Sequence, residues 1–177
     1  LHKIMDRHDI AVIASGPSVG HVPDDHRLSA STANSALGSV DLVVFVGQYC
    51  MPNPGDWALP PGVPTIRVHP VQEDIGRNWA VDLGIVSDEK FFLEELADVL
   101  PKKKRSIWVN ELAASREAFQ EYSAMMYKTG LDHSASTGAL HPAVLAQEME
   151  NFFFKGDVDP KQTVMVGGGF TIGRFAA

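Results

Sequence analysis

Short apolar runs alternate with helical patterns over the first hundred residues. Runs rich in β-branched residues, each bounded by Gly, Pro or Asp, predict strands at 10–14, 42–46, 65–69 and 83–86. The segments between them predict a weak helix over 31–37, a turn of helix over 73–79 and a strong helix over 88–100. Alternating strands and helices are typical of an α/β, doubly wound parallel sheet.

The strands differ in the burial that their patterns predict. The continuous apolar runs 10–14 and 42–46 favour strands covered on both faces. In 65–69, Arg67 and His69 alternate with apolar residues, which predicts an open sheet edge or the rim of a site. In the helix 88–100, the apolar positions that share one face are Phe92, Leu96, Val99 and Leu100.

A basic run at 102–105 ends the alternation of strands and helices. We predict that it is a solvated linker at a domain boundary. Apolar residues at helical spacing then predict an amphipathic helix from Ser106 to Lys128, with Gly130 placed to end it. Pro142 opens a third region, with a helix to about Phe153, a fifth strand at 163–166 and a glycine-rich loop. We therefore expect three segments, at residues 1–101, 102–139 and 140–177.

Composition narrows the class of protein. The chain has 177 residues, is 45% hydrophobic and carries a formal net charge of -7, which favours a soluble globular protein over one that binds nucleic acid or an anionic membrane. Its one cysteine, Cys50, cannot form an internal disulfide, so we expect a cytoplasmic protein. Leu1 at the start and the uncapped residues 175–177 at the end suggest part of a longer chain.

Few residues suggest chemistry on their own. The glycines that follow the strand 163–166 could cradle a phosphate or form a tight crossover, but they match neither the dinucleotide fingerprint nor a P-loop. His21, Asp24, Asp25 and His26 could ligate a metal, although a hydrogen-bonded surface loop is the better reading because their spacing matches no metal motif. No catalytic triad or metal cluster is visible, so we assign no catalytic residue and no metal ligand.

Three motifs in order carry a resemblance to a known family. They are the loop Gly20-x-x-Pro23-x-x-His26, the segment 39–47 that ends at Gly47, and the segment 66–78 with His69-Pro70. Together they resemble the thiamine-diphosphate-dependent enzymes of the acetolactate synthase type, which include benzoylformate and oxalyl-CoA decarboxylases.

The resemblance implies which part of the chain corresponds to which domain of the family. Residues up to about 100 are similar to the Rossmann-like central domain, whose opening strand and helix would precede Leu1. Residues 106–131 resemble the linker helix, and residues from His141 onward resemble the start of the cofactor-diphosphate domain. The residues that match the family's thiamine diphosphate loop are Gly168, Gly169, Phe170 and Thr171.

The resemblance also implies properties of a parent enzyme. That enzyme would use thiamine diphosphate and magnesium, act on a 2-oxoacid as a lyase or transferase, and form a homodimer or homotetramer. The family's thiazolium-activating glutamate and magnesium-binding segment have no counterpart in these residues, so we expect the chain alone to be inactive.

Some family members hold FAD or ADP at the strand ends of the central domain. The corresponding residues here are Gly47, His69, Ser87 and Asp88. Residues 48–51 replace the arginine of flavin-binding members, and His69 and Gln72 replace acidic residues, which favours an empty or differently occupied cleft over FAD. The alternatives are a stand-alone nucleotide-binding or regulatory module of similar fold and, less favoured because the fingerprint is missing, a piece of an NAD-linked oxidoreductase.

Overall fold

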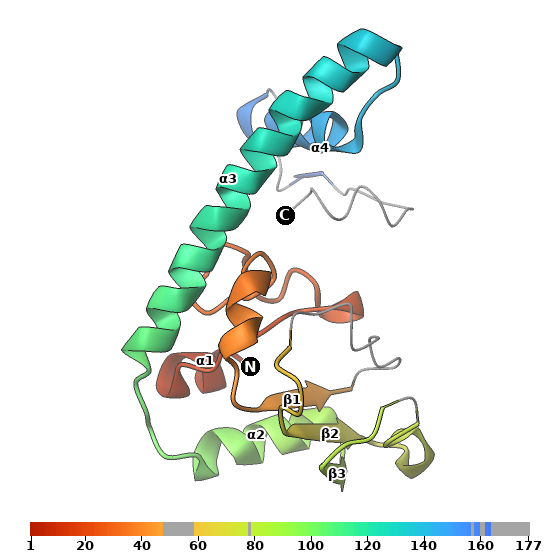
Figure 1. Cartoon of the computed structure of the whole chain (residues 1–177). Helices are drawn as coiled ribbons and strands as arrows, with labels where there is room; N and C mark the ends of the chain where they lie inside the picture. Colours follow the sequence, from red (N-terminus) through yellow and green to blue (C-terminus); the bar gives the residue numbers. More distant parts are fainter. Residues whose placement is uncertain (48–58, 78, 157, 160–161, 164–177) are drawn as a thin grey trace. The chain divides into compact units, whose positions relative to one another are not determined.

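The computed structural model describes residues 1–47, 59–77, 79–156, 158–159 and 162–163 (Figure 1). The chain divides into two compact units, Leu1–Ser115 and Arg116–Ala177. The division falls inside the long helix α3 (Ser106–Thr137). The domain boundaries expected at residues 101 and 139 stay predictions.

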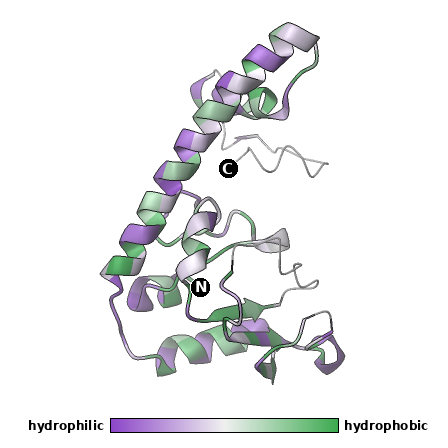
Figure 2. Ribbon diagram, in the orientation of Figure 1, coloured by the Kyte–Doolittle hydropathy of each residue, from purple (hydrophilic) through white to green (hydrophobic). Residues whose placement is uncertain are grey.

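The first unit contains a three-stranded parallel sheet. Its strands are β1 (Val43–Val46), β2 (Thr65–His69) and β3 (Leu83–Val86), in the order β1-β2-β3. Figure 2 shows β1 as an apolar strand, as its run of valines and phenylalanine predicts. The predicted α/β fold is confirmed, and these three strands lie within one residue of their predicted bounds.

Two helices accompany the sheet. Helix α2 (Glu89–Val99) packs on β2, and α1 (His2–His8) packs on α2 (Figure 1). The apolar face of α2 is rotated from the predicted one: Ala97 is buried, whereas Val99 is 71% exposed. The half-buried residues Phe92, Leu93 and Leu96 explain the rotation, because together with Ala97 they form a stripe centred away from Val99.

The first predicted strand, at residues 10–14, is wrong as a member of the sheet. Val12 forms an isolated parallel bridge with Ser29, and its backbone exchanges hydrogen bonds of 2.9 Å with Leu28 and Ala30. Its apolar neighbours pack on a core that lies beside the sheet rather than under it. That core consists of Met5, Val22, Leu28, Ala30, Ala33, Ala36, Leu37 and Leu112.

Three short 3-10 helices lie in the connections that the structure describes. They are η1 (Gly16–Ser18), η2 (Asn34–Ser39) and η3 (Gln72–Asp74). The last two replace the predicted helical segments 31–37 and 73–79. Both sequences are short and hold serine, glycine or clustered acidic residues, so they sustain one or two tight turns rather than an α-helix.

The polar residues of β2 are buried, so the open edge predicted from their alternation is wrong. Arg67 is 1% exposed and His69 is 8% exposed, because β2 is the central strand. Arg67 shares a face of the sheet with its register partners Phe45 and Gly84. The segment after β2 folds over this face, where Trp79 packs against Phe45 with ring centroids 5.7 Å apart.

Gly84 allows this cover to approach the sheet. A Cβ atom at Gly84 would lie 2.5 Å from Cγ2 of Ile75, which is closer than any real contact. The lack of a side chain on this strand is therefore a packing requirement.

We expect Gly84→Ala to lower the free energy of unfolding by about 1–3 kcal/mol, because Ile75 must move off the sheet. Ile75→Ala removes the clashing methyl group, so the double variant should lose less stability than the sum of the two single variants. Urea unfolding of all four proteins measures this coupling. Simple additivity would contradict the close contact.

A carboxylate at the end of α1 joins three distant parts of the first unit. Asp9 has a left-handed backbone, with φ 47°, and a side chain that is 4% exposed. Its Oδ2 accepts a hydrogen bond of 2.9 Å from the backbone N–H of Arg105. Its Oδ1 lies 2.8 Å from Nη2 of Arg27 and 3.5 Å from Nζ of Lys104. We call these four residues the Asp9 clasp.

The Asp9 clasp adds a contact to the predicted linker at residues 102–105, whose residues 102–104 are exposed as expected of a solvated segment. The guanidinium of Arg105 also donates to the carbonyl of His8, and the Lys104 ammonium donates to the carbonyl of Asp6 at 2.9 Å. The second half of the basic run is therefore folded against the end of α1. The hydrogen bond from the Arg105 backbone, followed by the charges of Arg27 and Lys104, holds the pKa of Asp9 below its ordinary value against the opposing effect of burial.

The lowered pKa fixes the sign of a pH dependence. The folded protein binds fewer protons at Asp9 than the unfolded chain does, so the clasp stabilises fully above the ordinary Asp pKa and is lost as pH falls through the lowered value. We expect Asp9→Asn to cost roughly 2–3 kcal/mol at pH 7 and progressively less in acid. Urea unfolding between pH 7 and pH 3 measures this difference. The exposed Asp25→Asn is the control, and a pH-independent loss would contradict the assignment.

The second unit is a helical hairpin. Helix α4 (Pro142–Glu150) folds back on the end of α3, and a π-helical turn, η4 (Asn151–Lys155), follows it. Pro142 starts α4 as predicted, but Gly130 does not end α3. A Cβ atom there would lie 2.9 Å from Cγ2 of Val144, so Gly130 is where the two helices meet. The helix ends at Thr137, and Gly138 follows with φ 72°.

No helix among the residues that the structure describes is long and apolar enough to cross a membrane. Residues 164–166 of the predicted fifth strand, and the glycine-rich loop after them, lie outside the described residues.

Candidate functional site

The four residues predicted to line a nucleotide cleft come together at one edge of the sheet. Gly47, His69 and Ser87 stand at the carboxyl ends of β1, β2 and β3, and Asp88 follows directly. The backbone N–H of Gly47 donates to Val68 at 3.0 Å, and that of Ser87 donates to His69 at 3.2 Å. We call this edge the carboxyl edge; ligands of doubly wound sheets bind at such an edge.

The imidazole of His69 is engaged by the turn that follows it. Its Nδ1 lies 3.1 Å from the backbone nitrogen of Val71 and 3.2 Å from the Val71 oxygen, so either tautomer contacts this backbone. The Asp74 carboxylate lies 3.7 Å from the same nitrogen and accepts a 3.0 Å hydrogen bond from Arg77. His69 thus shapes the turn between β2 and η3.

The space above Gly47 is filled by the first residue of α2. Gly47 has φ 64°, and a Cβ atom there would lie 2.9 Å from Cγ of Glu89. This side chain therefore stands where a ligand would approach the end of β1.

Asp88 caps the start of α2. Its Oδ1 accepts hydrogen bonds of 2.9 Å and 3.1 Å from the backbone N–H groups of Lys90 and Phe91. Free N–H groups at a helix start attract phosphate, but here a carboxylate of the chain occupies two of them. Ser87 is used locally as well, because its hydroxyl donates to the Asp88 carbonyl at 3.0 Å.

The charges at the carboxyl edge are unfavourable for binding an anion. Asp74, Asp88 and Glu89 bring carboxylates there, and the nearby guanidinium of Arg77 is bound to Asp74. Among the residues that the structure describes, none forms a cradle for a diphosphate at this edge. The described residues therefore do not fit FAD or ADP.

Residues 20–28, which we call the histidine loop, are held by a hydrogen bond within the loop and by contacts with α1. Nδ1 of His26 accepts from the backbone of Leu28 at 3.2 Å, and Nε2 of His26 lies 3.8 Å from the Asp6 carboxylate. His21 contributes its backbone oxygen, which lies 2.9 Å from Nε2 of His2. Within the described part of the chain, no three His, Cys, Asp or Glu side chains are grouped to hold a metal ion.

A comparison with protein-family models identifies the architecture. The model described as "Thiamine pyrophosphate enzyme, central domain" matches residues 1–96. The chain belongs to this family. The match contains all three strands, the histidine loop and the carboxyl edge, so these features are parts of a thiamine pyrophosphate enzyme central domain.

Family membership indicates thiamine diphosphate as the cofactor of the enzymes to which such domains belong. The residues expected to contact it, Gly168, Gly169, Phe170 and Thr171, lie outside both the matched and the described residues. Their role stays a prediction.

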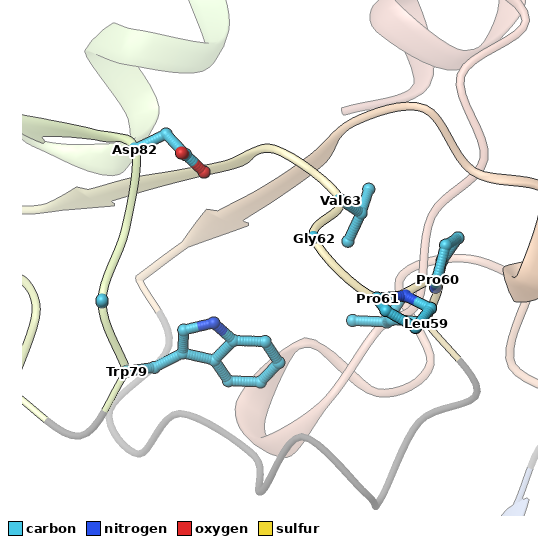
Figure 3. Close-up of a pocket in the computed structure, with 8 residues that line it drawn as sticks. Leu59, Pro60, Pro61, Gly62, Val63, Trp79 and Asp82 are labelled. Carbon is cyan, nitrogen blue, oxygen red and sulfur yellow. The ribbon is translucent and has the colours of Figure 1, made fainter.

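The central domain has a recess that the sequence patterns did not indicate. It lies at the amino ends of β2 and β3, opposite the carboxyl edge, between Trp79 and the turn of residues 59–63 (Figure 3). Its volume is about 520 Å³, and Asp82 stands at its rim. The signal available in the sequence was Pro60-Pro61-Gly62, which marks a rigid turn directly before a strand.

The capping role of Asp88 is testable. Asp88→Ala should lower the free energy of unfolding by about 1 kcal/mol, because two N–H groups of α2 lose their acceptor. Asp88→Asn keeps an acceptor and should stay within a few tenths of a kcal/mol of the parent. Chemical unfolding without any ligand is the measurement. Equal stability of all three proteins would show that the carboxylate is not a structural cap.

Proposed function

We propose that this chain is the scaffold part of a thiamine-diphosphate-dependent 2-oxoacid decarboxylase or carboligase of the acetolactate synthase type. It supplies the central domain and the connecting helix α3. The cofactor, with magnesium, is held elsewhere in the parent enzyme, with Gly168, Gly169, Phe170 and Thr171 as its contact in this chain. The family match over residues 1–96 and the ordered motifs at Gly20–His26, Gly47 and His69 support the proposal.

The single observation that carries the scaffold role is the use of the carboxyl edge by the protein itself. Glu89 fills the approach to Gly47, the backbone of Val71 engages His69, and Asp88 caps α2. A domain that bound a dinucleotide there would need open glycine backbone and free N–H groups. The rival function, a nucleotide-binding or regulatory module, therefore has no supporting geometry among the described residues.

The outer surface of the sheet supports a partner role for the scaffold. The edge strand β3 exposes Leu83 and Val86, and α2 exposes Phe91. Large apolar side chains that are exposed on an edge strand and on the helix that follows it favour contact with another domain or subunit. We propose that the parent enzyme is a homodimer or homotetramer that works in the cytoplasm.

The test assays the parent enzyme, with this chain in its continuous reading frame, for CO₂ release from 2-oxoacids with thiamine diphosphate and Mg²⁺. We expect activity that requires the cofactor and no activity from the 177-residue chain alone. Gly169→Val should raise the KM for thiamine diphosphate by at least about tenfold, since the new side chain obstructs the approach of the cofactor to the loop. Ser87→Ala is the matched control and should leave that KM unchanged.

Calorimetric titration of the 177-residue chain with ADP and with FAD separates the scaffold from its rival. The scaffold proposal expects no saturable binding at ligand concentrations up to about 1 mM, a range that covers ordinary cellular nucleotide sites. Saturable binding that Asp88→Ala or Glu89→Ala alters would place a nucleotide at the carboxyl edge and overturn the scaffold role.

A further inference from the structure

The recess lies at the amino ends of β2 and β3, which we call the amino edge, and it has two walls that face each other. Figure 3 shows the indole of Trp79 on one side and the turn with Pro60, Gly62 and Val63 on the other. A volume of about 520 Å³ falls within the range of small-molecule sites, about 300–1,000 Å³. Nothing in the scaffold role uses this space.

Both walls are fixed before any ligand arrives. The backbone N–H of Val63 donates to the Pro60 oxygen at 3.2 Å, with proline and a glycine of φ 72° between them. This is the arrangement of a type II turn, in which the proline ring restricts the backbone further. Opposite the turn, Trp79 is supported by its ring contact with Phe45, which is buried.

Among the described residues of the rim, Asp82 carries the charge. Oδ2 of Asp82 accepts hydrogen bonds from the backbone N–H of Thr65 at 2.7 Å and from the Thr65 hydroxyl at 3.3 Å. The second oxygen receives no hydrogen bond from the described residues, and Figure 3 shows the carboxylate pointing toward the space between the walls. Among the described lining residues, Asp82 is the only charged one.

We propose that this recess binds a small organic cation with a flat apolar body, such as an arylalkylammonium ion. The indole of Trp79, the prolines and Val63 offer apolar surface to its body. The Asp82 carboxylate pairs with the ammonium group, while its fixed oxygen keeps the charge in place. An anion of the same size would meet a carboxylate and no cationic side chain among the described lining residues.

The test follows the indole N–H signals of the full 177-residue chain by NMR during titration with phenethylammonium. The signal that disappears in Trp79→Phe identifies Trp79. We expect a saturable shift of this signal with a Kd between about 0.1 and 5 mM, the range for a small ligand in an open site. The neutral analogue 2-phenylethanol should bind at least about fivefold more weakly, because it lacks the charge that Asp82 recognises.

Two variants separate recognition from folding. Asp82→Asn keeps an acceptor for Thr65 and should weaken phenethylammonium binding at least about fivefold. Ala80→Lys places an ammonium group in the recess and should abolish binding, and it decides the question alone if Asp82→Asn does not fold. Asp25→Asn, which removes a charge elsewhere, should leave the Kd unchanged. No shift of the Trp79 signal up to 20 mM, equal binding of the neutral analogue, or wild-type binding by Ala80→Lys would each overturn the proposal.

Discussion

The buried carboxylate of Asp9 is the constraint that holds the first unit together. A charged group that is 4% exposed is costly unless ion pairs and hydrogen bonds surround it, and two cationic side chains, Arg27 and Lys104, converge there with the backbone N–H of Arg105. The residues that meet at Asp9 come from the end of α1, from the histidine loop and from the segment before α3. Since these parts are far apart in sequence, the clasp closes long loops with one compact set of contacts. The core around Met5, Leu28 and Leu112 lies among the same three parts.

The sheet follows a related principle, because its central strand is partly polar. Arg67 and His69 are buried in β2, so the structure must provide them with partners and a cover. The segment after β2 supplies a partner for His69 through the Val71 backbone, and a cover through Trp79, which packs on Phe45, the register partner of Arg67. The bare backbone of Gly84 lets this cover reach the sheet. The alternating pattern of β2 suggested exposure, but its polar residues Arg67 and His69 are buried under this segment.

Local sequence patterns predicted where strands and helices form better than they predicted which other elements each one packs against. The runs at 42–46, 65–69 and 83–86 became strands because β-branched residues favour extended backbone wherever a parallel partner is available. The run at 10–14 has the same pattern, but its one bridge is to Ser29, and the core beside the sheet buries its side chains. Gly130 looked like a helix end because a lone glycine usually marks one, whereas its role is to admit α4. Such errors arise where tertiary contact, rather than local preference, sets the outcome.

At the candidate site, too, the tertiary contacts could not be predicted from local sequence patterns. The family resemblance pointed to Gly47, His69, Ser87 and Asp88, and the parallel sheet brings them to one edge because its strands end on the same side. What occupies that edge depended on Glu89 and the Val71 backbone, which no spacing rule indicates. The start of α2 is the decisive point, because each of its N–H groups can serve either an anion or the chain's own carboxylate. Since Asp88 takes two of them, the edge favours rigidity over ligand binding, whereas the opposite edge of the sheet keeps a recess with a charged rim.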